Sequence, residues 1–391
     1  MTDEFSGWLR KGLGRAAVFL KTHDNRPYRD ALLHACIHNL TYDPQCEDGR
    51  APYLLNLIEL SGDTRFYRDG ILAALESNNE EQDFGQLFEL AASFAVKGDD
   101  EMKRAMYAAF ERLGFGKAGL SAADELVRLD GVDALLLAAK TFGEEEVDDR
   151  PWQFRHLVET LEKRDGKRPL PAQLDRFIRE VEDYDRKWEQ KPQRPPEPDI
   201  EEAADAMLVE SDKERLIGYL RMFGRRPFPR AIDRLLELAR NEDDRIARAA
   251  LVALENISDP RVRALGLDLM TGLKWRGFAV GLLVRNGEMG DYRTLERLLE
   301  ETKDPEVYHH LGMDVRDFVK AYQSEEAERC LLHLYENEAC SLCRRGIVKE
   351  LIAINRFPDW MREECRYDAD SRTRERCILA VPCPSAASES G

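Results

Sequence analysis

Pairs of amphipathic helical segments recur along this chain, about 36 residues apart. One pair is Tyr53–Leu60 with Phe66–Leu75, and the next is Phe84–Val96 with Met102–Leu113. Apolar residues follow helical spacing in each segment, and glycine with aspartate separates the members of each pair. A short helix with one apolar stripe must bury that stripe against a neighbour. The series therefore predicts stacked helices, as in an α-solenoid.

The pattern is clearest in the second half of the chain. Ala231–Arg240 and Ile246–Ile257 each carry one apolar stripe, and the polar run Asn241–Asp244 separates them. Asp259-Pro260 opens a further segment, and Asp304-Pro305 repeats this arrangement. Aspartate accepts hydrogen bonds from the unpaired N–H groups of a helix start, and proline in the first turn loses no bond there. Both dipeptides therefore predict helix N-termini.

The residue composition favours helices throughout. Leu outnumbers Val and Ile together, and the helix formers Leu, Ala, Glu and Arg dominate. We therefore predict an all-α protein.

Several residues between Phe228 and Leu269 follow a known pattern: Asp244-Arg245, Arg248 and Asp259-Pro260-Arg261-Val262-Arg263. This run resembles HEAT repeats, and is similar in particular to the short bacterial repeats of phycobilisome-lyase-like proteins. In that family a turn aspartate and an arginine of the second helix link neighbouring repeats, and Asp244 and Arg248 match these positions. The resemblance implies an α-solenoid, a right-handed superhelix of antiparallel helix pairs. It implies a fold and not an activity.

Four segments are expected along the chain. Residues 1–143 form N-terminal, degenerate HEAT-like helical repeats, and residues 203–377 form C-terminal HEAT-like repeats. Between them, residues 144–202 are rich in proline and charge, which predicts an irregular insertion or hinge with one helix, Leu174–Trp188. Residues 378–391 are rich in Ser, Ala and Pro and predict a disordered tail.

Charge and cysteine usage indicate a cytoplasmic protein. The formal net charge is -17, which repels phosphate backbones in general. No apolar run approaches the roughly 18 residues of a membrane span, and the start, Met1-Thr2-Asp3-Glu4, is acidic, unlike a secretory leader. The 8 cysteines in 391 residues are too sparse for a disulfide scaffold.

One candidate metal site lies near the start of the chain. His34 and His38 share one face of a predicted helix at i and i+4, and Cys46 follows in the next loop. Two imidazoles at this spacing chelate a borderline metal, with Cys46 or Asp43 as a further ligand. The alternative is a helix with interfacial histidines and a buried cysteine.

A second candidate is the pair Cys340 and Cys343. A Cys-x-x-Cys pair at a turn holds zinc through two thiolates, or works as a redox couple. A structural zinc site needs two more ligands, for which Cys365 and Cys377 are the best candidates in the sequence. The alternative is that these thiols pack between the last helices. No resident cofactor is expected beyond this possible structural zinc.

A basic and aromatic run stands out in the acidic chain and is a candidate partner-binding surface. Its arginines are Arg221, Arg225, Arg226 and Arg230. Clustered arginines beside aromatic rings bind phosphates, bases or an acidic protein segment. The alternative is an inter-helix turn in which Phe223 and Phe228 plug the core. Trp275 and Arg276 are further surface candidates.

No phosphate-binding loop, nucleophile elbow or dinucleotide fingerprint occurs in the sequence. The best-supported function is therefore a non-enzymatic HEAT-repeat scaffold or adaptor, which binds another protein through a concave helical surface, for instance through a basic segment of that partner. One alternative is a nucleic-acid-binding HEAT-like protein of the kind that recognises DNA lesions. Another is a metal-dependent or lyase-type enzyme. The sequence leaves the oligomeric state open.

Overall fold

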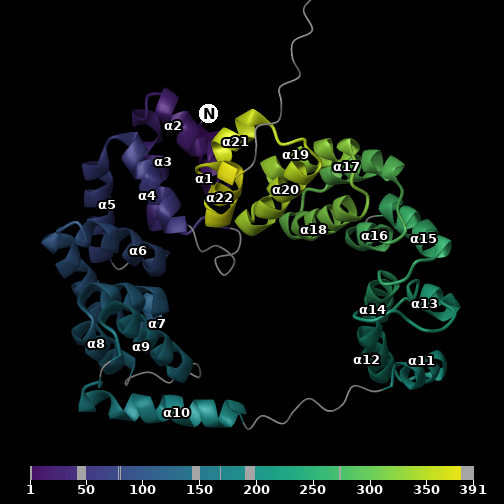
Figure 1. Ribbon diagram of the computed structural model, residues 1–391, viewed down its shortest axis with the longest axis horizontal. Helices are drawn as coiled ribbons and strands as arrows, with labels where there is room; N and C mark the ends of the chain where they lie inside the picture. The colour runs from purple at the N-terminus through teal and green to yellow at the C-terminus, as the bar shows by residue number, and fades with distance from the viewer. Residues whose placement is uncertain are drawn as a thin grey trace, which may run out of the picture. The chain divides into compact units, whose positions relative to one another are not determined.

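The computed structural model describes residues 2–41, 50–77, 79, 81–142, 150–167, 169–189, 199–272 and 274–379. Within these ranges the regular secondary structure is all helical, which confirms the predicted fold class (Figure 1). None of these helices combines the length and apolar character needed to cross a membrane. The described chain divides into two compact units, residues 2–189 with 363–374, and residues 199–362 with 375–379.

The first unit begins with helices of two to three turns and continues with longer ones. In chain order they are α1 (Thr2–Lys11), α2 (Arg15–Thr22), α3 (Arg29–Ile37), α4 (Arg50–Ser61), α5 (Thr64–Glu76), α6 (Phe84–Ala95), α7 (Asp100–Asp130), α8 (Val132–Phe142), α9 (Arg150–Asp165) and α10 (Asp175–Glu189). The segments that the sequence pattern marked between Tyr53 and Leu113 lie in α4 to α7. Within α7 the backbone breaks at Gly114 and Gly119, whose φ angles are 70° and 82°. Glycine adopts these left-handed angles without a steric penalty.

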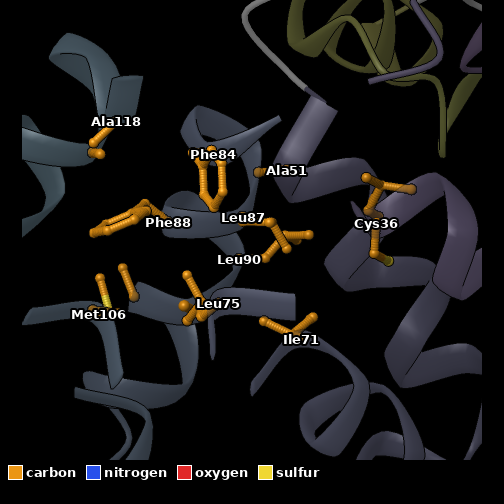
Figure 2. Close-up of a cluster of buried hydrophobic side chains, with 14 of the residues drawn as sticks. Cys36, Ala51, Ile71, Leu75, Phe84, Leu87, Phe88, Leu90, Met106 and Ala118 are labelled. Atoms are coloured by element: carbon orange, nitrogen blue, oxygen red, sulfur yellow. The ribbon is translucent and has the colours of Figure 1, made fainter. Parts of the chain in front are cut away.

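Helix α6 lies at the centre of the first unit's core (Figure 2). Leu87, Phe88 and Leu90 of α6 are fully buried, and α6 contacts α3, α4, α5 and α7. A helix that is apolar on nearly all sides belongs inside a core rather than on a surface. Gln86 is the polar exception, because its amide donates to the carbonyls of Ala35 (2.9 Å) and Cys36 (2.8 Å) at the end of α3.

Residues 144–202 are more helical than the prediction of one helix. Besides α10, which contains the predicted segment, this span contains α9 and the start of α11, and α9 buries Phe154, Leu157 and Leu161 in the first unit's core. The helical spacing of these apolar residues was not recognised in the sequence, because many prolines and charged residues surround them. The proline-rich tract 190–198 and residues 380–391 lie outside the described residues. Residues 378 and 379, expected in the tail, form the end of α22 (Ser371–Leu379).

The second unit repeats one arrangement of helix pairs. Its helices are α11 (Ile200–Val209), α12 (Lys213–Phe223), α13 (Asp233–Leu238), α14 (Asp244–Leu254), α15 (Pro260–Thr271), α16 (Arg276–Leu283), α17 (Tyr292–Glu301), α18 (Pro305–Ala321), α19 (Glu328–Asn337) and α20 (Ser341–Ala353). Each even-numbered helix from α12 to α20 packs against the odd-numbered helix before it, and each from α12 to α18 also packs against the next even-numbered helix. Asp259 and Asp304 are N-caps with proline directly after them, as predicted.

A segment near the end of the described chain belongs to the first unit. It is residues 363–374, which include the end of helix α21 (Asp359–Cys365), the loop after it and the start of α22. Ala369 N donates to Gly12 O at 3.0 Å, and Glu364 pairs with Arg15 at 2.6 Å. A Cβ on Gly14 would lie 1.7 Å from Glu364 O, so this contact requires glycine.

Candidate functional site: a cationic cleft

The second unit contains a cleft of about 730 Å³ between α12, α14 and the turn that precedes α16. Its basic and aromatic lining comprises Arg221, Arg225, Arg245, Arg248, Lys274 and Trp275. A concavity of this size is typical of sites for a small ligand or a short peptide segment.

The C-terminal end of α12 positions Arg221 and Arg225. Arg221 is in the last turn of this helix and Arg225 directly follows its C-cap residue, Gly224, and both line the cleft. The Asn256 amide donates to the carbonyls of Phe223 (3.3 Å) and Gly224 (2.9 Å), which would otherwise be unpaired at the helix end. Phe223 and Phe228 are buried with ring centroids 4.8 Å apart, which confirms their predicted role as core plugs beside the turn.

Gly224 and Val252 form part of the cleft wall. A Cβ on Gly224 would lie 2.8 Å from Val252 Cγ1, below any ordinary contact distance. The missing side chain therefore allows α12 and α14 to approach closely at this point.

Helix α14 supplies two more arginines near its N-terminus. Asp243 caps this helix by accepting from the N–H groups of Arg245 (3.0 Å) and Ile246 (3.4 Å). Arg245 then forms a two-pronged ion pair with Glu214, at 2.6 and 2.8 Å. Lys274 pairs with Asp244 at 2.6 Å. These two basic groups are therefore neutralised by the protein itself.

The other three arginines of the cleft carry charge that the protein does not neutralise. In the described part of the chain, Arg221, Arg225 and Arg248 form no ion pair, and all three are exposed. The Arg248 guanidinium lies 5.8 Å from the centre of the Phe278 ring. Three uncompensated cations in one concavity of an acidic chain form a local anion-binding field.

Of the six residues predicted to bind a partner, Arg221, Arg225 and Trp275 line the cleft. Arg230 instead pairs with Glu201 and Asp205, and Arg276 pairs with Glu301 at 2.9 Å. Arg226 is exposed and does not line the cleft. Arg248 also lines the cleft, but it was not among the residues predicted to bind a partner.

Asp244 and Arg248, which match the linking positions of HEAT repeats, both contact the next helix pair. Asp244 binds Lys274 before α16, and Arg248 faces Phe278 within α16. These contacts join α14 to α16 along the even-numbered helices.

The predicted histidine pair lies together in the first unit. The His34 and His38 ring centroids are 4.3 Å apart, and His38 Nδ1 lies 3.0 Å from Glu81 O. Burial, with the nearby His38, lowers the pKa of His34, which favours its neutral form. Cys46 lies outside the described residues. The described residues around this pair offer no third ligand in a metal-binding arrangement.

Cys340 and Cys343 lie together in the second unit, and the residue beside them is His309. The proposed extra ligands Cys365 and Cys377 are not part of this group. A hydrogen bond from the Cys343 side chain lowers the pKa of Cys340 to about 6, and the same bond raises the pKa of Cys343. The spacing Cys-x-x-Cys marked both cysteines in the sequence but did not link them to His309, because 30 residues separate His309 from Cys340.

No protein-family profile, curated protein or solved structure matched this chain.

Proposed function

We propose that this protein is a non-enzymatic scaffold, and that the cleft of its second unit binds an acidic segment of another protein. The single observation behind this proposal is that three arginines, Arg221, Arg225 and Arg248, line one concavity without a carboxylate partner among the residues that the structure describes. Guanidinium groups bind carboxylates with two parallel hydrogen bonds, so each arginine fits one acidic side chain. Trp275 adds an aromatic surface of the kind enriched in protein interfaces.

We further propose that the second unit is an α-solenoid of HEAT-like repeats. The alternation of helix pairs from α11 to α20 supports this, as do the contacts along the even-numbered helices. In such an array the successive second helices form a continuous surface, which suits an extended peptide. The cleft lies on two of those helices, α12 and α14.

An acidic peptide fits the cleft better than nucleic acid does. A formal net charge of -17 repels a polyanion over its whole length, whereas a short segment meets only the local field. The negative net charge of the chain had suggested a partner with a basic segment. Such a segment would have to bind a different, acidic surface of this protein.

The test is direct binding of a fluorescein-labelled peptide of alternating Glu and Ser, followed by fluorescence anisotropy. We expect the double variant Arg221→Glu/Arg225→Glu to weaken binding by at least about 150-fold, since each of the two lost charge-assisted bonds contributes roughly 1.5 kcal/mol or more. The matched control is Arg285→Glu/Arg293→Glu, which reverses two exposed charges of the same unit outside the cleft. Equal affinity of the wild type and the cleft variant would contradict the proposal.

The same assay with a labelled duplex and a single-stranded oligonucleotide tests the alternative. Binding of DNA that exceeds binding of the acidic peptide at the same salt concentration, and that is lost in the cleft variant, would favour a nucleic-acid-binding protein. The scaffold proposal predicts the reverse order.

A further inference from the structure

Two cysteines and a histidine converge at the N-terminus of α20. The Sγ atoms of Cys340 and Cys343 and a ring nitrogen of His309 lie within 4.8 Å of one another. Cys340 is the N-cap residue of α20, Cys343 is in its first turn, and His309 comes from α18. Both cysteines are buried, whereas His309 is partly exposed.

A buried carboxylate orients this histidine. His309 Nδ1 lies 3.0 Å from Oε1 of Glu338, which is 1% exposed. An ionised carboxylate only accepts, so Nδ1 carries the proton and donates it to Glu338. The other ring nitrogen, Nε2, then faces the thiols and lies 4.0 Å from Cys343 Sγ. Cys340 N also donates to Glu338 Oε1, at 3.0 Å, so one carboxylate fixes two members of the group.

Among the residues that the structure describes, the carboxylate of Glu338 has an unpaired buried oxygen. Its second oxygen, Oε2, is buried and has no hydrogen-bond partner in the described part of the chain. A Cβ on Gly312 would lie 3.1 Å from that oxygen, so a larger residue would crowd the carboxylate. Arg344, which is 0% exposed, donates to the Glu338 carbonyl at 3.3 Å. An unpaired buried carboxylate oxygen is costly unless a positive charge lies nearby.

We propose that Cys340, Cys343 and His309 Nε2 bind one Zn²⁺ ion, with Glu338 as the carboxylate that orients the histidine. Sulfur and imidazole nitrogen are the ligands that zinc prefers. In a tetrahedral site, bonds of about 2.3 Å to sulfur and about 2.0 Å to nitrogen place the ligand atoms roughly 3.5 to 3.8 Å apart. The present spacing therefore needs to contract by roughly 1 Å or less. A carboxylate that accepts from the other ring nitrogen is the usual partner of a zinc-bound histidine.

Binding of one Zn²⁺ ion at this site releases two protons. Zn²⁺ displaces the protons of the two thiols, which pass to solvent, and binds as a neutral unit with the two thiolates. The three protein ligands leave a fourth position, which we assign to water on the side where His309 is partly exposed. This site lies on α18 and α20, apart from the cleft on α12 and α14, so it does not depend on the proposed function.

The experiment is metal analysis of the full-length chain, purified without an affinity tag or chelator in the presence of a reductant. We expect about one zinc per chain in the wild type. Cys340→Ser, Cys343→Ser and His309→Gln should each reduce the zinc content at least fivefold. The control Cys330→Ser changes an equally buried thiol of the same unit that donates to Tyr292 O, and it should retain the metal.

A second measurement uses only the wild type and therefore tests the proposal even if the variants do not fold. Zinc-free wild type is titrated with Co²⁺, which gives thiolate charge-transfer absorption and intense visible bands only in a tetrahedral site with sulfur ligands. We expect these bands to saturate at about one cobalt per chain and to vanish on addition of zinc. The proposal is overturned if reduced wild type contains no zinc and shows no such bands with cobalt. It is also overturned if the folded cysteine variants bind as much zinc as the wild type.

Discussion

Arg263 binds Asp291 through a two-pronged ion pair, with Nη1–Oδ2 at 2.5 Å and Nη2–Oδ1 at 2.9 Å. Arg263 is on α15, and Asp291 lies in the short 3-10 turn Met289–Asp291 directly before α17. The pair therefore joins two successive helix pairs of the second unit. Asp291 is buried, and Arg263 pairs with its carboxylate there.

Removal of Arg263 should destabilise the second unit. We expect Arg263→Ala to lower its free energy of unfolding by about 3 kcal/mol, because Asp291 is left as a buried charge without its partner. The control is Arg261→Ala on the same helix, whose pairs with Asp233 and Asp259 are exposed to solvent and should therefore contribute much less to stability. Guanidinium denaturation measures both variants, and equal losses would contradict this account.

Two half-buried carboxyl groups should make the second unit less stable at higher pH. Burial, with the nearby Asp314, raises the pKa of Glu255 to about 8, and burial, with the nearby Asp317, raises the pKa of Asp314 to about 7. The folded state keeps these protons while the unfolded state loses them near pH 4. Stability therefore falls as the pH rises from about 4 to about 8, and is constant above that range.

The double variant Glu255→Gln/Asp314→Asn should remove this slope. We expect the free energy of unfolding of the wild type to fall between pH 5 and pH 8, and that of the double variant to stay nearly constant over this range. The control Glu306→Gln removes an exposed charge of α18 and should leave the wild-type slope intact. Denaturation curves at both pH values provide the measurement, and a double variant with the wild-type slope would refute the prediction.

The cap of α18 should contribute measurable stability. Asp304 Oδ1 accepts from Glu306 N and Val307 N, both at 3.0 Å. Asp304→Ala should cost about 1 kcal/mol, whereas Asp304→Ser retains a capping oxygen and should cost less than half of that. Thermal unfolding followed by circular dichroism distinguishes the two, and identical midpoints for Ala and Ser would argue against the cap.

In the core around α6, a substitution that leaves a cavity should destabilise the protein more than one that changes only the shape of the side chain. Leu87 is 0% exposed and lies among the side chains shown in Figure 2. Leu87→Ala should destabilise the first unit by about 3 kcal/mol, through lost burial and the cavity left behind. Leu87→Met keeps the volume and should cost less than about 1.5 kcal/mol. Comparable losses in urea denaturation would mean that this site is not tightly packed.

Local patterns in the sequence predicted the helices and their ends. Asp259-Pro260 and Asp304-Pro305 start helices because capping depends on residues within one turn. The stripe of α9 was missed because Pro151 and many charged residues surround Phe154, Leu157 and Leu161, which weakens the periodic signal.

The candidate sites could be predicted only in part. Arg221 and Arg225 were identified because arginines are frequent in this part of the sequence. The carboxylates that neutralise Arg230 are those of Glu201 and Asp205 on α11, which lie 29 and 25 residues earlier in the chain. The grouping of His309 with Cys340 requires that α18 pack against α20. Such long-range pairings are set by tertiary packing and leave no spacing signal in one sequence.

A charge-swap experiment on the cleft tests the central claim most directly. The dissociation constants of a Glu/Ser peptide and a matching Lys/Ser peptide are measured with the wild type and with Arg221→Glu/Arg225→Glu. Binding through the cleft arginines predicts that the wild type prefers the Glu peptide by at least about tenfold, and that the variant reverses this preference. An unchanged preference in the folded variant would show that the acidic segment binds elsewhere and would contradict the account.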